Sequence, residues 1–169
     1  MNRIILGMAG TNYVLVAITM YLGLLSEPTA DPTHLTEDYF RYHFLMGLFT
    51  ALFTMLVHCM VFTYFLGTNR WVKEATVAYS LDGVLLAESR RLRGRAFATA
   101  MVSMLLVVAT IATGAGAHTR TWPTWLHQVV PATTYLFMFV AYWIEIHAIE
   151  QHIQLTDRVM DEVQSRRRK

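Results

Sequence analysis

The 169-residue chain has few of the residues and motifs that stabilise soluble proteins or give them catalytic activity. It contains one cysteine, so no disulfide bond can form within a single chain, and it contains only four prolines. Charged residues make up 15% of the chain and hydrophobic residues 54%, a balance that is unusual for a soluble domain. No phosphate-binding loop, Gly-rich dinucleotide turn, CxxC pair or serine-nucleophile motif occurs, so we expect no catalytic activity of the chain's own.

What the chain has instead is four long apolar runs, at about residues 4–25, 44–67, 96–117 and 129–149. About 20 apolar residues are enough to cross the hydrocarbon core of a bilayer as a helix. The first run is too long for a signal-peptide core and lacks a small-x-small cleavage site, so we expect it to be retained. The runs predict an all-α integral membrane protein, with residues 1–169 forming a single four-helix transmembrane domain.

Positive charge is distributed unevenly over the connections between these runs. The connection at 68–95 and the C-terminal tail are basic, whereas the loop after the first run is mainly acidic. The basic residues of the middle connection are Arg70, Lys73, Arg90, Arg91, Arg93 and Arg95. Because Lys and Arg accumulate on the cytoplasmic side, this pattern predicts that both termini are cytoplasmic. The expected location is the inner membrane of a bacterium.

Apolar stripes with helical spacing continue past the spans, over about 68–95 and 150–166. They predict that helices 2, 3 and 4 extend into a cytoplasmic stalk of roughly 20 Å, at about 1.5 Å per residue. The side chains expected in its core are Trp71, Leu85, Leu92 and Met160. The alternative is that these segments are amphipathic helices lying on anionic lipid.

Polar residues inside the spans need partners, because hydrocarbon provides none. Asn12, His58 and Ser103 lie eight to ten residues from the cytoplasmic edge on three different spans, and Tyr142 on the fourth lies near the same level. We expect these four residues to form one polar intramembrane layer. A haem ligand at His58 and a proton or ion pathway are the alternatives.

A second group of histidines lies at the opposite edge. His43 opens the second span and His127 precedes the fourth, so they have the equal depth that two axial haem ligands need; His118 is a substitute. The spacing of His43 and His58 resembles that of stacked ligands in membrane b-type cytochromes, although His147 lies too near the inner edge to complete a second pair. A Zn or Cu site that uses His34, His43 and His118 is a further alternative. Haem b is therefore a candidate cofactor, but no cofactor is the first expectation.

The fourth span ends in a run of acidic residues and histidines. The members of this group are Glu145, His147, Glu150 and His152. Similar spacing occurs in di-iron bundles, but those need carboxylates from further helices, which the other spans lack. We expect the group to mark the transition to the cytoplasm, with Glu145 or Glu150 pairing with Arg70 or Lys73.

These observations favour an accessory or anchoring subunit of a larger membrane complex, for example one that takes part in electron transport. The stalk suits a cytoplasmic partner, and the spans suit lipid and other membrane subunits; no nucleic acid is expected. A small b-type cytochrome that exchanges electrons with quinone is the first alternative. A transporter or channel is the second, and the lack of broken helices disfavours it.

Overall fold

The computed structural model describes residues 2–26 and 34–168, and its regular elements are all helices. They are α1 (Asn2–Leu25), α2 (His34–Ala78), α3 (Gly83–His118) and α4 (Thr124–Arg167). Each one contains a stretch that is long and apolar enough to cross a membrane. The prediction of an all-α chain with four such helices is therefore confirmed. The acidic residues Glu27 and Asp31 of the first loop lie outside the described residues.

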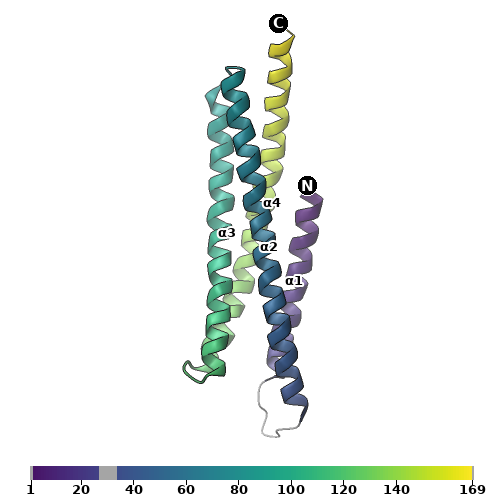
Figure 1. Ribbon diagram of the computed structural model, residues 1–169, viewed down its shortest axis with the longest axis vertical. Helices are drawn as coiled ribbons and strands as arrows, with labels where there is room; N and C mark the ends of the chain where they lie inside the picture. Colours follow the sequence, from purple (N-terminus) through teal and green to yellow (C-terminus); the bar gives the residue numbers. More distant parts are fainter. Residues whose placement is uncertain (1, 27–33, 169) are drawn as a thin grey trace.

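Three of the helices are much longer than a bilayer requires. α2 has 45 residues and α4 has 44, so each is roughly 65 Å long, about twice the thickness of a hydrocarbon core. α1 has only 24 residues and runs beside the lower part of the bundle, whereas α2, α3 and α4 continue beyond it (Figure 1). The continuous extensions of helices 2, 3 and 4 that the apolar stripes predicted are present. We call the part formed by residues 68–95 and 150–167 the stalk.

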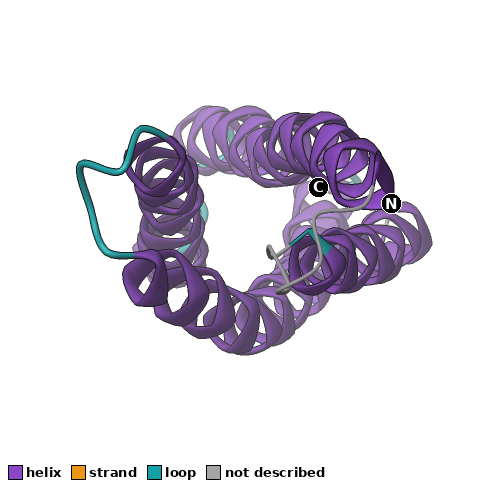
Figure 2. Cartoon of the chain, turned by 90° about the horizontal axis from the view of Figure 1, so that it is seen from below, coloured by secondary structure: helices purple, strands orange, loops and turns teal. Residues whose placement is uncertain are grey.

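The chain runs up and down through the bundle, and the four helices surround a common axis when viewed from one end (Figure 2). α1 packs along α2, α2 along α3, and α3 along α4. At the tip of the stalk, α2 turns directly into α3. Ser80 has a positive φ of 49°, Leu81 is buried, and the carboxylate of Asp82 accepts a hydrogen bond of 2.9 Å from the Val84 N–H. This N-cap starts α3 and closes the hairpin.

The stalk has an apolar core in which α2, α3 and α4 all take part. Its buried side chains are Val72, Ala75, Leu81, Leu85, Leu155, Val159 and Val163. The prediction for Leu85 is confirmed, with 9% of its surface exposed, and Trp71 is half-buried against this core. Leu92 is buried as predicted, with 1% exposed, but it belongs to the neighbouring apolar cluster that contains Phe65. The prediction for Met160 is wrong, because its side chain is 46% exposed. Val159 and Val163 occupy the buried stripe of α4, so the residue after Val159 faces outward.

Candidate functional site

Two histidines, His43 and His127, face each other at the end of the bundle opposite the stalk. His43 lies in the third turn of α2 and His127 in the first turn of α4, and the centres of their rings are 6.1 Å apart. We call them the histidine pair. The Nδ1 atom of His43 is 2.9 Å from the backbone oxygen of Thr19 in α1, and Nδ1 of His127 is 3.3 Å from Oγ1 of Thr113 in α3. Each ring is thus oriented by a neighbouring helix through one nitrogen.

Each ring of the histidine pair lies directly against a glycine. A Cβ atom placed on Gly23 of α1 would come within 2.9 Å of Cε1 of His43. A Cβ on Gly114 of α3 would come equally close, 2.9 Å, to Cε1 of His127. Such contacts are too short for carbon atoms, so both rings fit only because the neighbouring residue has no side chain. The sequence pattern did not indicate either glycine as part of a site.

The other histidines expected near this end are arranged differently. His118 stacks on Phe40, with ring centres 5.0 Å apart. His34 belongs to α2, but its side chain lies outside the described residues. Within the part of the chain that is described, no three His, Cys, Asp or Glu side chains gather in a way that could hold a metal ion. The Zn or Cu site with His34, His43 and His118 stays a prediction.

The two residues of the histidine pair could hold the iron of a haem, because imidazole is a common haem ligand. A ligating histidine usually has its second ring nitrogen hydrogen-bonded to a carbonyl, carboxylate or other polar group, and Thr19 and Thr113 supply such partners. A tetrahedral zinc site would need further protein ligands, which the pair does not provide.

A second polar centre lies in the middle of the bundle. His58 of α2 and Glu145 of α4 are fully buried, and Nδ1 of His58 is 3.1 Å from Oε1 of Glu145. Glu145 therefore does not pair with Arg70 or Lys73 as one form of the expectation had it, and the alternative pairing through Glu150 stays a prediction. Arg70 pairs instead with Glu74, one turn along α2, at 2.8 Å. Glu145 belongs to the buried face of α4, which turns it toward the bundle axis.

Asn12 and Tyr142 from the expected polar layer are in direct contact. Asn12 Nδ2 donates a hydrogen bond of 2.7 Å to the Tyr142 hydroxyl, and Thr54 Oγ1 donates to Asn12 Oδ1 at 3.0 Å. The rings of His58 and Tyr142 stack, with centres 5.2 Å apart and planes 21° from parallel. Ser103 is fully buried on α3, but its hydroxyl has no hydrogen-bond partner among the described residues. The layer therefore joins α1, α2 and α4 through side-chain contacts.

A third polar cluster lies where the stalk begins, and the sequence interpretation missed it. Nε2 of His152 is 2.8 Å from the Ser89 hydroxyl, and Asn69 Nδ2 donates to the same hydroxyl at 2.7 Å. Arg93 donates to Asn69 Oδ1 at 3.4 Å. Burial lowers the pKa of His152 from its ordinary value of 6.5, so its imidazole is neutral near pH 7. The stripe of buried positions along α4 could have indicated it, because His152 lies seven residues after Glu145.

The fold and these centres define a class: a long four-helix bundle with an apolar surface, a buried polar middle and a histidine pair at one end. Comparison of the chain with protein-family models, with curated proteins and with solved structures gives no match.

Proposed function

We propose that the chain is an integral membrane protein whose four helices cross the bilayer. Large apolar side chains point outward at the level of the central polar residues, where they would contact lipid. Leu52, Leu105 and Phe139, for example, are 63%, 62% and 65% exposed. In water such a surface would favour aggregation, whereas a bilayer covers it without cost.

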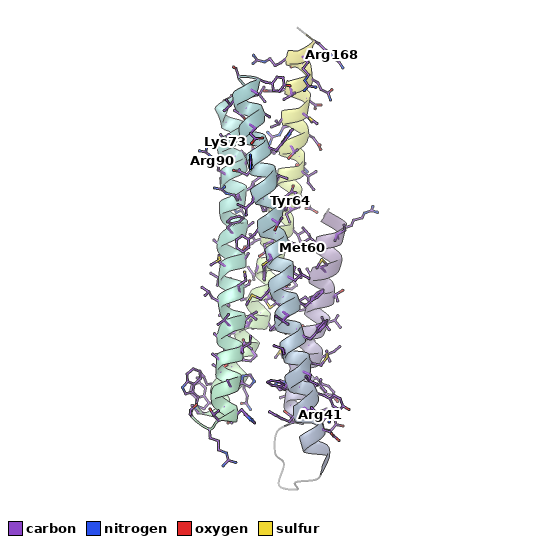
Figure 3. All side chains as sticks on the ribbon, in the orientation of Figure 1. Arg41, Met60, Tyr64, Lys73, Arg90 and Arg168 are labelled. Carbon is purple, nitrogen blue, oxygen red and sulfur yellow. The ribbon has the colours of Figure 1, made fainter. Side chains whose placement is uncertain are left out.

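The orientation that we propose has the stalk and both termini in the cytoplasm. Lys73, Arg90 and Arg168 lie in the stalk half of the bundle, far from Arg41 at the other end (Figure 3). A cluster of positive residues beside the spans favours the cytoplasmic side, because such segments are translocated poorly. The histidine pair then lies near the outer surface of what we propose is a bacterial inner membrane.

We infer that the function is that of a small b-type cytochrome, in which His43 and His127 ligate one haem. The observation that carries this proposal is the pair itself: two imidazoles at one depth on different helices, each held through Nδ1 and each fitted against a glycine. A haem bound there would supply one-electron chemistry. The protein's part is to orient both imidazoles through Thr19 and Thr113.

The test is the absorption spectrum of the purified full-length protein, oxidised and then reduced with dithionite. We expect a b-type spectrum in the wild type and its loss in His43→Gln and in His127→Gln. His147→Gln is the matched control, because His147 is exposed and lies against Trp143 on the outer side of α4. Absence of haem from protein expressed with sufficient haem, or a spectrum unchanged in both variants, contradicts the proposal. Metal analysis of the same samples tests the Zn or Cu alternative.

An accessory or anchoring role in a larger membrane complex is the second candidate, and the stalk favours it. A groove near the tip of the stalk, between α2 and α4, is lined by the aromatic rings of Trp71 and Tyr79 together with Met160 and Arg167. The experiment is to purify the tagged chain gently from its native membrane, with and without Met160→Asp. Loss of a co-purifying membrane subunit in the variant supports docking at the stalk, and purification of the wild type alone contradicts it.

A further inference from the structure

The central pair of His58 and Glu145 has more polar atoms than partners. Both side chains have 0% exposure, and their closest approach is the 3.1 Å between Nδ1 and Oε1. Neither ring nitrogen and neither carboxylate oxygen makes a well-directed hydrogen bond with any other described residue. Buried groups of this kind normally satisfy all their hydrogen-bonding atoms, so the exception calls for an explanation.

The surroundings of the pair provide no fixed countercharge. The titratable group that faces it from α4 is Tyr142, whose ring stacks on His58. The facing groups from α1 and α3 are uncharged: Asn12 contacts Tyr142, and Thr99 interacts with the carboxyl group of Glu145. Within the described residues, no Lys or Arg is within salt-bridge distance of Glu145.

The charge of the pair therefore depends on a single proton. With one shared proton the pair is neutral overall, whether that proton is on His58 Nδ1 or on a Glu145 oxygen. Without it the pair carries one negative charge, and with a second proton it carries one positive charge. Either net charge is costly in a low-dielectric interior, so the singly protonated pair is the preferred state.

On one side, a chain of polar side chains leads from this pair toward the histidine pair. The Tyr142 hydroxyl accepts from Asn12, and Asn12 accepts from Thr54. One turn along α2, the hydroxyls of Thr50 and Thr19 are 2.9 Å apart. The backbone carbonyl of Thr19 also contacts Nδ1 of His43, the α2 member of the histidine pair. These side chains can hydrogen-bond to water on this side of the pair. Water is needed to complete a route for protons, because an amide does not relay them and no described side chain makes a well-directed hydrogen bond to the pair.

The stalk side of the pair is closed by apolar packing. One cluster of buried residues lies between it and the polar cluster around His152. Its members are Ile5, Val61, Tyr64, Phe65, Leu92, Ala96, Ala148 and Ile149. The Tyr64 hydroxyl points to the far side of this cluster, where it is 3.4 Å from Nδ1 of His152. Side chains without donors or acceptors interrupt any hydrogen-bonded path in this direction.

We propose that His58 and Glu145 form a proton-binding site that exchanges protons with the histidine-pair end of the bundle and not with the stalk end. The proton comes from water at that end, adds to the carboxylate–imidazole pair, and returns by the same route; no electron or other group is transferred. The site does not require haem, so it goes beyond the proposed cytochrome function and can fail or succeed independently of it.

The experiment uses infrared spectroscopy of the purified full-length protein in detergent. The carbonyl stretch of a protonated carboxylic acid should appear on acidification of the wild type and be absent in Glu145→Gln. In His58→Gln the proton concentration at which half of this band has appeared should differ at least tenfold from that of the wild type, because the carboxyl group has lost its partner. A band that is independent of pH, or that is unchanged in Glu145→Gln, overturns the site. A band that responds to Na⁺ at constant pH also overturns it, because the ligand is then a metal cation.

The direction of access is tested with a matched pair of Tyr→Phe variants. After transfer into D₂O, the deuterium shift of the carboxyl band should develop at least tenfold more slowly in Tyr142→Phe than in the wild type. Tyr64→Phe, which removes a hydroxyl on the stalk side, should leave the rate unchanged. Equal rates in the wild type and Tyr142→Phe, or slowing by Tyr64→Phe alone, overturn the proposed route.

Discussion

The buried pair of His58 and Glu145 allows a quantitative prediction about stability. We expect His58→Leu to lower the free energy of unfolding by about 3–5 kcal/mol, because it leaves the carboxyl group of Glu145 buried without its partner. Glu145→Leu should cost a similar amount for the converse reason. Replacement of both residues by leucine removes both polar groups, which is often nearly neutral when the shapes are similar.

The magnitude follows from the position of the pair. Both side chains have 0% exposure, so water cannot replace the missing partner, and the full cost of an unpaired polar group remains. The double variant should therefore be more stable than either single variant, with a coupling energy of about 3 kcal/mol or more. The cost of His58→Leu should also be smaller in acidic than in alkaline buffer, because protonation removes the charge of the stranded carboxylate.

The assay is unfolding of the purified protein from mild detergent by a denaturing detergent, followed by the helical circular dichroism signal. Cys59→Ala is the control, because Cys59 adjoins His58 but is exposed, and its loss should change stability by less than about 0.5 kcal/mol. Simple additivity of the two single costs in the double variant would refute the reasoning, because it would mean that the two groups do not interact.

Four further predictions test other parts of the molecule. Leu92→Asp should cost several times more stability than Met160→Asp in the same unfolding assay, because Leu92 is 1% exposed and Met160 is 46% exposed. Gly114→Val should abolish the b-type spectrum by displacing the imidazole beside it, whereas Gly94→Val, which has no atom within 4 Å of its added Cβ, should preserve it. Burial lowers the pKa of His152, so its contribution to stability should be full above the ordinary value of 6.5 and decline as the pH falls below it; His152→Gln should remove this decline. Fused to the C-terminus, a reporter that works only in the cytoplasm should be active and one that works only in the periplasm should be inactive; the reverse result contradicts the proposed orientation.

The number, type and approximate extent of the helices could be predicted from the sequence alone. Runs of 20 or so apolar residues have few alternatives to a helix that can cross a membrane, and their hydrophobic spacing continued into the stalk. The burial of Leu92 followed from the same periodicity. Met160 shows the limit of this approach, because a one-residue error in the phase of a long helix turns a side chain by about 100°.

The partners of the polar residues depended on the tertiary structure. The placement of Glu145 near the end of an apolar run suggested a membrane edge, but the rotation of α4 turned the carboxyl group onto His58. The spacing of Glu145 and His152 indicated a shared face of α4, but the partners of His152 and the fit of Gly23 and Gly114 against the histidine pair could not be read from the sequence. Hydrophobicity is a local property that can be summed along the chain. Contacts between helices depend instead on the rotation and register of each helix, which only the packed bundle determines.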